Sequence, residues 1–339
     1  MATLPSRVLA AGVLALLAAV AVVDFALRPG RGAAADLRIA RGVDRREAAL
    51  LAGSPVTRAV RPWFNLLQLE LFRATPEEVL LTRADWLFYA EGLAPPREPE
   101  TADRLAGRVG FLREVAASAE RSGARAVVWL VPAKWRLCAE HAPGLRVSPA
   151  RRDLYGRVRA ALLAAGVDAP DLLEDLQRTA PDDPASLWRA DDTHLSGDGY
   201  ARLVRRWLPA ALGLTAVDVA ARLDAAPRLP PRTEPGDLAR LLQLPDGWAD
   251  RFASPQRGWV APPPRDAPGS DVLVVGDSNL VVWERLLPRL IQVAGAVAVD
   301  ARYVEDAARG LGRAWDEYRD RPPRLLLMVV GERGFATGW

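Results

Sequence analysis

The sequence contains very few of the side chains that bind metals or form covalent cross-links. Its 339 residues include one cysteine and two histidines, which excludes an intramolecular disulfide, a cysteine-rich zinc module and a cluster of histidine ligands. Lys134 is the only lysine among 45 basic residues, and 42 acidic residues reduce the net charge to +3. Because acids and arginines are interspersed, a nucleic-acid partner is not indicated. We expect a globular protein that works without a metal or another cofactor.

The longest apolar run lies at the N-terminus. Residues 8–27 read VLAAGVLALLAAVAVVDFAL, and Asp24 is the only charge among them. A helix of this length spans about 30 Å, which is enough to cross a bilayer. We predict an uncleaved signal anchor within residues 1–35. A cleaved signal peptide, with its site near residues 32–36, and a buried helix are the alternatives. Arginines follow the run more often than they precede it, so charge asymmetry does not determine its orientation.

The rest of the chain alternates between predicted strands and helices. Residues 36–64 are predicted to be a membrane-proximal helical stretch, and residues 65–339 a single α/β domain with a proline-rich insertion of loops at 223–270. Continuous apolar strands separated by helices favour a mainly parallel sheet covered on both faces. The strands expected in that sheet are 125–131, 271–275, one near 296–300, and 325–330; a hairpin of VLL and WLFY around Thr82–Asp85 precedes them.

A glycine–aspartate–serine sequence follows one of these strands, at residues 276–278. Open α/β sheets bind ligands at the carboxyl ends of their strands. Gly276 allows a tight turn, and a helix beginning near Asn279 would aim its amide groups at the same position, ready to hold an oxyanion. This arrangement suits a nucleophilic Ser278. The alternative is that Asp277 or Ser278 only caps the helix.

A nucleophilic serine needs a base, and the base needs a carboxylate that orients it. His141 lies in a polar loop without such support, and we expect it to be an ordinary surface histidine. His194 has Asp191 and Asp192 just upstream, with Thr193 between, and precedes a helix. A carboxylate so close in sequence must contact the imidazole Nδ1 within a turn. His194 is therefore the better base, although a surface loop or a helix cap would give a similar pattern.

Together these motifs resemble the SGNH hydrolase superfamily. The Asp–His pair stands before the serine, with DTH in place of the usual D-x-x-H, which is similar to the AlgJ/AlgX group of alginate O-acetylation proteins. Three further segments resemble that group: the opening residues 65–92, the V-P-x-K segment in 131–144 and the Glu–Arg strand end in 329–335. The resemblance covers about residues 65–335. It implies a three-layer α/β/α, flavodoxin-like domain.

The resemblance also implies roles for individual residues. Ser278 corresponds to the nucleophile, His194 to the base and Asp192 to the acid that orients it. Asp191 is the alternative acid, because it stands three residues before His194, where ordinary SGNH hydrolases place theirs. Asn279 departs from the aromatic residue that commonly follows the serine in the group.

The function implied by this resemblance is O-acetylation of an exported polysaccharide, such as alginate, through an acetyl-serine. A membrane-bound O-acyltransferase would supply the acetyl groups, and the domain would lie in the periplasm, anchored to the inner membrane. Two other functions are compatible with the same motifs. One is an SGNH-type carbohydrate acetylesterase, since the same triad serves hydrolysis. The other is a non-catalytic glycan-binding or scaffold subunit of a polysaccharide export complex.

Asn279 and three further residues are weaker candidates for substrate binding or support. Lys134 follows a predicted strand, and its retention in an arginine-rich chain suggests a position where a compact ammonium is needed, unless it survives by chance. Glu332 and Arg333 follow the last strand and would reach the same edge of the sheet. A buried ion pair that steadies this loop is as good an interpretation as contact with substrate.

Overall fold

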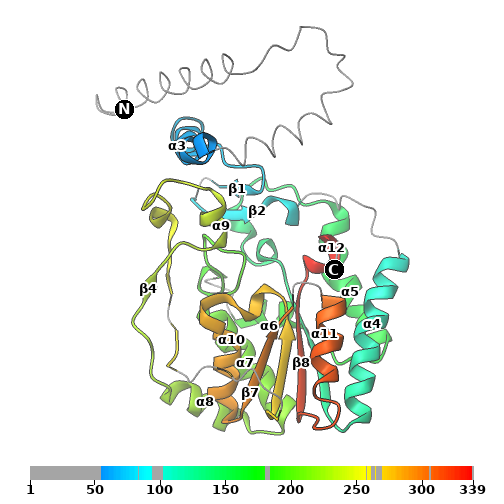
Figure 1. Ribbon diagram of the computed structural model, residues 1–339. Coiled ribbons are helices and arrows are strands. Elements are labelled where there is room, and N and C mark those ends of the chain that lie inside the picture. Colours follow the sequence, from blue (N-terminus) through cyan, green and yellow to red (C-terminus); the bar gives the residue numbers. More distant parts are fainter. Residues whose placement is uncertain are drawn as a thin grey trace.

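A parallel sheet of four strands forms the centre of the computed structural model (Figure 1). The structure describes residues 55–82, 84–93, 102–179, 184–256, 258–260, 264, 269–304 and 307–337. Every residue of the two central strands is buried, as expected for a sheet covered on both faces. The predicted parallel α/β sheet is confirmed. Its strands, in order across the sheet, are β3 (Arg125–Val131), β8 (Leu325–Gly331), β6 (Val272–Gly276) and β7 (Val299–Tyr303).

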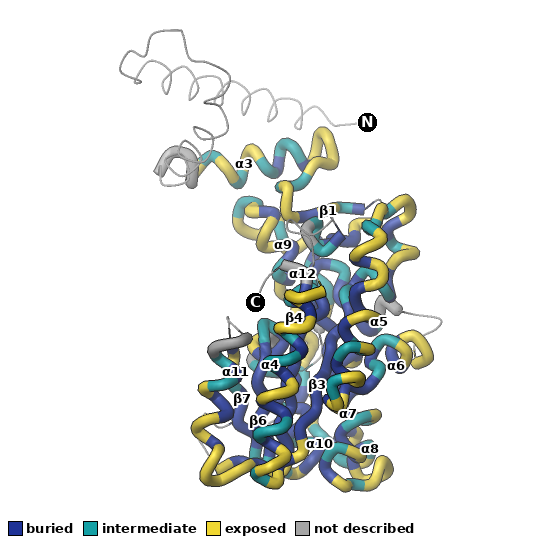
Figure 2. The backbone as a smooth tube through the Cα atoms, turned by 90° about the vertical axis from the view of Figure 1, so that its right-hand side faces the viewer, coloured by how far each residue is buried: buried dark blue, intermediate teal, exposed yellow. Residues whose placement is uncertain are grey.

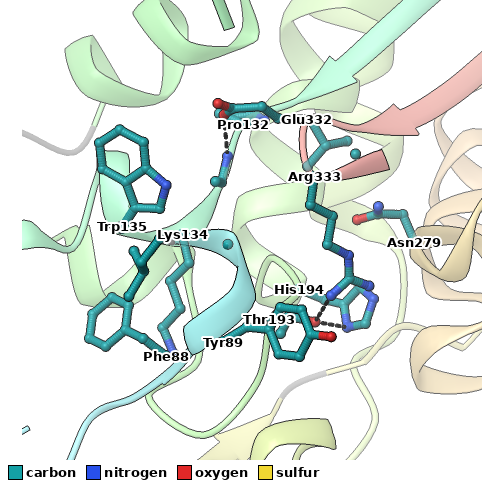
Figure 3. A pocket seen from close by; sticks show the side chains of 15 residues that line it. Phe88, Tyr89, Pro132, Lys134, Trp135, Thr193, His194, Asn279, Glu332 and Arg333 are labelled. Atoms are coloured by element: carbon teal, nitrogen blue, oxygen red, sulfur yellow. Dashed lines mark hydrogen bonds between the residues drawn. The ribbon is translucent and has the colours of Figure 1, made fainter. Parts of the chain in front are cut away.

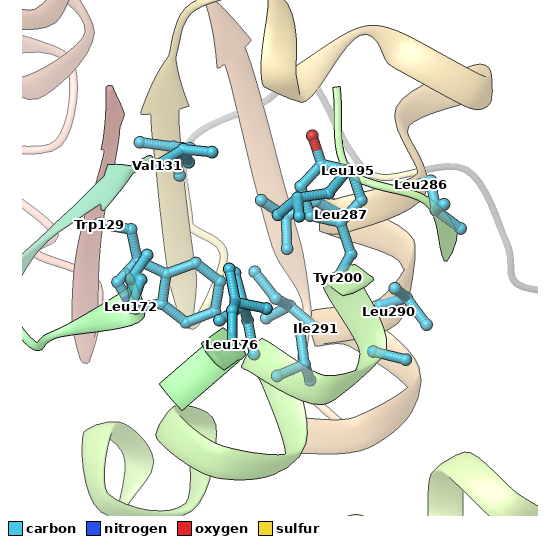
Figure 4. Packing of buried hydrophobic residues seen from close by; sticks show 14 of the residues in the cluster. Trp129, Val131, Leu172, Leu176, Leu195, Tyr200, Leu286, Leu287, Leu290 and Ile291 are labelled. Carbon is cyan, nitrogen blue, oxygen red and sulfur yellow. The ribbon is translucent and has the colours of Figure 1, made fainter. Parts of the chain in front are cut away.

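Helices cover the two faces because side chains along a strand point alternately to opposite sides. Val127 and Trp129 of β3 belong to one apolar cluster, whereas Val128 and Leu130 belong to the other. Figure 4 shows the first cluster, in which α10 packs beside the sheet. The first face is covered by α6 (Leu172–Thr179), α7 (Gly197–Leu212), α8 (Ala216–Ala225) and α10 (Val282–Gly295), and the second by α4 (Ala102–Arg121), α5 (Pro149–Ala164) and α11 (Ala307–Asp316). The three-layer prediction is thus confirmed.

A smaller apolar cluster lies beyond the carboxyl ends of the strands (Figure 1). The predicted hairpin is present, with β1 (Val79–Leu81) paired antiparallel to β2 (Leu87–Tyr89). Helix α3 (Pro55–Phe72) and helix α9 (Asp237–Leu241) pack against it through Leu69 and Leu238. Figure 2 shows the contrast between this end, with its many exposed positions, and the buried strands. The hairpin therefore covers the edge of the sheet at which the sequence predicts the active site.

The proline-rich insertion contains more regular structure than the predicted loops. Strand β4 (Arg232–Thr233) pairs with β5 (Pro255–Gln256), and α9 lies between them in sequence. Helix α9 forms because Leu238 and Ala239 are fully buried against the hairpin. The insertion thus places one short helix against the hairpin that covers the predicted site.

The apolar run at residues 8–27 lies outside the described residues, as does most of the predicted membrane-proximal stretch. Helix α3 runs without interruption across the predicted boundary between residues 64 and 65. Within the part of the chain that the structure describes, no helix combines the length and the apolar character needed to cross a membrane.

Candidate active site

Ser278 stands immediately beyond β6, in a single turn of 3₁₀ helix formed by Ser278–Leu280. Gly276 is required before this turn, because a Cβ there would lie 2.2 Å from the carbonyl oxygen of Val329 in the neighbouring strand. Asp277 fixes the turn by accepting hydrogen bonds from the backbone N–H groups of Asn279 at 3.0 Å and Gly331 at 2.7 Å. The carboxyl ends of β6 and β8 are therefore tied together at Ser278.

The turn differs in one respect from the sequence-based expectation. The long helix α10 begins only at Val282, and the amide groups that follow Ser278 are already engaged. Asn279 N–H donates to the Asp277 carboxylate and Leu280 N–H to the Asp277 carbonyl, each at 3.0 Å. These two amides stabilise the turn, so they are not available to a developing oxyanion.

The loop before α7 carries Asp192 and His194, and its shape is set by local contacts. Trp188 donates its indole N–H to the carbonyl of Thr193 at 3.1 Å and forms a bridge with Leu195. Ser196 then caps α7 by accepting the N–H of Gly199 at 3.1 Å. The loop is thus closed on itself before the helix begins.

The structure brings Ser278, His194 and Asp192 into one hydrogen-bonded row. His194 Nε2 lies 2.9 Å from Ser278 Oγ, and His194 Nδ1 lies 2.7 Å from Asp192 Oδ1. The same carboxylate oxygen accepts the backbone N–H of His194 at 3.0 Å, which locks the short turn. Both Asp192 and His194 are buried. This is the geometry that general-base activation of a serine requires.

Asp191 has a different environment from Asp192. Its carboxylate accepts hydrogen bonds from Arg189 at 2.8 Å and from the N–H of Gly236 at 2.6 Å, and both ion-pair partners are fully buried. Burial raises the pKa of Asp191, against the effect of Arg189. Burial acts on Asp192 in the same direction, but hydrogen bonds from His194 and the positive charge it can carry bring the Asp192 pKa below its usual range. Asp192 is therefore the carboxylate that orients the imidazole.

Among the weaker candidates from the sequence, Arg333 contacts Ser278 directly. Its guanidinium donates to Ser278 Oγ at 2.9 Å. It also donates to Thr193 Oγ1 at 3.2 Å and lies 5.8 Å from the ring centre of Tyr89 (Figure 3). Asn279 is buried beside it. Its side chain accepts from the Tyr200 hydroxyl at 2.8 Å and donates to Asp277 at 2.7 Å, so it braces the turn.

Lys134 and Glu332 have structural partners. The ammonium of Lys134 donates to the carbonyls of Leu87, Ala190 and Asp192 at 2.8, 2.8 and 3.0 Å, which joins the hairpin to the loop that carries His194. Burial lowers the pKa of Lys134 to about 8. Glu332 forms a paired contact with Arg136, at 2.6 and 2.7 Å, and accepts the N–H of Ala133 at 3.0 Å.

The expected surface histidine, His141, is half-buried and stacks on Trp86 with ring centres 4.0 Å apart. The site also contains one residue that sequence reasoning missed. Asp237, from the insertion, accepts the N–H of Thr193 at 2.7 Å, and its carboxylate lies 3.5 Å from His194 Nδ1. Its position after Gly236 at a helix start signals a cap, but nothing in the sequence connects it to the DTH motif.

Asp192, His194 and Asp237 could also be considered as ligands of a metal ion, since their ligand atoms lie within 4.8 Å of one another. Those atoms are already hydrogen-bonded: His194 Nδ1 to Asp192, and Asp237 to the backbone and hydroxyl of Thr193. In this structure the three side chains belong to one hydrogen-bonded network.

A pocket opens beside His194 and Arg333 (Figure 3). Its enclosed volume is small, about 60 Å³, and the cavity opens to solvent. Aromatic and apolar side chains form one wall, and polar groups form the other. The lining includes Phe88, Tyr89, Leu93, Pro132, Trp135, Thr193, His194, Asn279 and Arg333.

Comparisons with known proteins show which proteins the chain resembles. A family model described as "SGNH hydrolase-like domain, acetyltransferase AlgX" matches residues 79–282. The "Probable alginate O-acetylase AlgJ" of Pseudomonas aeruginosa is 30% identical over 334 residues, covering 90% of this chain and 83% of the relative. Its namesake from Pseudomonas syringae pv. tomato is 28% identical over 67% of this chain and 58% of its own length. The solved O-acetyltransferase domain of Pseudomonas putida AlgJ has the same fold, with a TM-score of 0.61 and 20% identity over 77% of this chain and 92% of that domain.

Proposed function

The chain belongs to the AlgX-type family of SGNH hydrolase-like acetyltransferases, and from this membership we propose that it transfers acetyl groups to hydroxyls of an exported polysaccharide through an acetyl-Ser278 intermediate. The family supports O-acetyltransferase activity, and the AlgJ relatives named for alginate make that polymer the first acceptor to test. The observation that carries the proposal is the row from Asp192 through His194 to Ser278.

The first half-reaction loads the serine. Ser278 donates its hydroxyl proton to His194 Nε2 as Oγ attacks the acetyl carbonyl carbon. The carbonyl electron pair moves to oxygen and gives a tetrahedral oxyanion, which then collapses as the donor's leaving group departs with the proton from His194. Asp192 accepts the Nδ1–H throughout and thus stabilises the imidazolium. The products are acetyl-Ser278 and the free donor group.

The oxyanion needs a positive partner, and Arg333 is in place to provide it. Its guanidinium lies 2.9 Å from Ser278 Oγ, whereas the amides of Asn279 and Leu280 are used by Asp277. A preorganised charge at this distance stabilises negative charge that develops in the transition state. We assign Arg333 to this role, which requires its contact with Oγ to shift to the adjacent oxyanion.

The second half-reaction transfers the acetyl group. A sugar hydroxyl in the pocket gives its proton to His194 and attacks the acetyl carbon, and Ser278 regains the proton as it leaves. The aromatic wall formed by Tyr89, Phe88 and Trp135 provides flat apolar surfaces of the kind that bind sugar rings.

The cellular setting is part of the same proposal and rests on the sequence. Residues 8–27 would anchor the chain in the inner membrane with the domain in the periplasm. A membrane-bound O-acyltransferase would then be the acetyl donor. Protease protection of the domain in spheroplasts with intact membranes would place it in the cytoplasm and overturn this topology.

The test is incubation of the full chain with a chromogenic acetyl ester, with and without an alginate oligosaccharide. We expect acetylated oligosaccharide, released chromophore, and labelling of Ser278 by a serine-directed phosphonate. Ser278→Ala should reduce all three to background, a loss of at least about a thousandfold, because the nucleophile is gone. Unfolding curves of the variant should match those of the wild type.

The other outcomes identify the other functions. Free acetate without acetylated sugar, across alginate and neutral oligosaccharides, would indicate an acetylesterase. No turnover and no labelling would indicate a binding or scaffold subunit. Turnover retained by Ser278→Ala would overturn the acetyl-serine mechanism itself.

A further inference from the structure

A segment of the insertion wraps around the loop that carries the Asp–His pair. We call residues 234–239 the strap. The strap carbonyl of Glu234 accepts a hydrogen bond from Arg189 at 2.5 Å, and the N–H of Gly236 donates to Asp191 at 2.6 Å. The N–H of Ala239 donates to the carbonyl of Asp191 at 3.2 Å. These contacts bind the strap to the loop over its whole length.

Asp237 is the side chain that the strap places against the site. Its Oδ1 accepts the N–H groups of Thr193 and Leu238, each at 2.7 Å, and its Oδ2 accepts the hydroxyl of Thr193. Three donors on one carboxyl group favour its ionised form. Burial, the charge of Asp192 and a side-chain hydrogen bond with Asp192 raise the Asp237 pKa, while His194 and Thr193 oppose the rise.

The Thr193 hydroxyl links this carboxylate to the serine. It donates to Asp237 and accepts from Arg333 at 3.2 Å, and Arg333 donates to Ser278 Oγ at 2.9 Å. On the other arm, the Asp237 carboxylate lies 3.5 Å from His194 Nδ1. The base His194 and the guanidinium of Arg333 are therefore both connected to the Asp237 carboxylate, which lies in the strap and not in the segment of either residue. Figure 3 shows Thr193 between His194 and Arg333.

We propose that Asp237 is a positioning residue for acetyl transfer, which holds the Thr193 hydroxyl so that Arg333 and His194 both face Ser278 Oγ. This inference rests on the proposed function and extends it to the insertion. The carboxylate orients Thr193 from the strap, Thr193 orients the guanidinium, and the same negative charge favours the imidazolium that forms during each half-reaction. Asp237 itself touches no reacting atom.

The experiment compares Asp237→Asn, Thr193→Val and Thr193→Ser in the full chain. The asparagine keeps one acceptor oxygen but cannot accept both Thr193 hydrogens, and the valine removes the hydroxyl without changing the side-chain shape. We expect kcat for the acetyl ester to fall between about tenfold and a hundredfold in Asp237→Asn and in Thr193→Val, with KM changed less than about threefold. The rate of phosphonate labelling at Ser278 should fall in parallel.

Two comparisons separate positioning from a purely structural role. Thr193→Ser restores the hydroxyl and should recover most of the lost kcat. The double variant Asp237→Asn with Thr193→Val should be little slower than the slower single variant, because both substitutions break the same connection between Asp237 and Thr193. The matched control is Asp224→Asn on α8, a fully exposed carboxylate, which should leave the kinetics unchanged.

Three results would overturn the inference. One is normal kcat in a folded Asp237→Asn variant of an active protein. The second is an Asp237→Asn defect that multiplies in full with that of Thr193→Val. The third is a defect accounted for by lost stability in unfolding curves. Absence of turnover and labelling in the wild-type chain would instead overturn the proposed function and this inference with it.

Discussion

The two halves of the site are held in place by different forces. The sheet side, which we define as Ser278, Asn279, Glu332 and Arg333, directly follows β6 and β8 and inherits its geometry from a parallel ladder. The loop side, which comprises Asp191, Asp192 and His194, has no such ladder. It is fixed by buried charges: Arg189 at Asp191, and Lys134 at the carbonyls of Ala190 and Asp192. Because the loop side has no sheet hydrogen bonds, its position depends on these two buried cations.

The largest effect should follow from removing the buried cation of the loop side. In Arg189→Met, the fully buried carboxylate of Asp191 would retain only the N–H of Gly236 among its direct partners described above. We expect a loss of about 3–5 kcal/mol in the free energy of unfolding, since breaking a buried pair leaves an uncompensated charge. Urea unfolding at pH 7 measures the loss.

The matched control for this variant is Arg319→Met, which breaks an exposed pair with Asp316 and should cost less than about 1 kcal/mol. The double variant Arg189→Met with Asp191→Asn should recover part of the lost stability, because the unpaired charge is gone. A loss in Arg189→Met no larger than that in Arg319→Met would show that the loop side does not depend on its buried cation.

The same substitution, glycine to alanine, can be made on the sheet side and in the strap that supports the loop side. A Cβ at Gly276, on the sheet side, would lie 2.2 Å from the carbonyl of Val329, and one at Gly236, in the strap, 2.3 Å from the carbonyl of Asp191. Gly276→Ala must push two core strands apart and should cost about 1–3 kcal/mol of stability as well as activity. Gly236→Ala should displace the strap and lower turnover by about tenfold, with a smaller loss of stability.

Gly107→Ala is the control for both, because nothing lies within 4 Å of a Cβ at this helical position. Its stability should rise by about 0.5–1 kcal/mol and its turnover should stay the same. If Gly236→Ala loses as much stability as Gly276→Ala, the strap belongs to the cooperative core and the distinction between the two sides fails.

The contrast also explains what the sequence could predict. The strands and the position of Ser278 were accessible because a buried apolar run and a following GDS are local signals. The pairing of Asp192 with His194 was accessible because two residues in one turn must meet. Asp237 stands 44 residues from its partner Thr193, inside a segment with no recognisable pattern, and only tertiary packing brings it there. The role of Asn279 as a brace for the turn depends on the Tyr200 hydroxyl and was equally invisible.

The smallest effect concerns pH and the ammonium of Lys134. Burial lowers its pKa in the folded chain to about 8, against an ordinary value of 10.5. Between these two values the unfolded chain binds the proton more strongly, so this residue makes stability rise with pH from about 8 to 10.5. The neutral amine, however, has two hydrogens for three carbonyl acceptors. We therefore expect turnover to fall about two- to threefold as pH rises through 8, since one contact to the loop side weakens.

Because Lys134 is the only lysine, the titration can be observed directly. Lysine labelled with ¹³C at Cε gives one NMR signal, which should shift with a midpoint near pH 8. Lys134→Met should be slower at pH 7 and should lack the decline above pH 8, because its side chain has no proton to lose. Comparison with the wild type at each pH separates the effect of the ammonium from that of Tyr155 and Tyr318, whose raised pKa values make stability fall at higher pH. A midpoint above 10 would show that burial does not lower the pKa of Lys134. The same decline in Lys134→Met would show that the ammonium does not hold the loop side, and the strap and Arg189 would then be the principal supports of that loop.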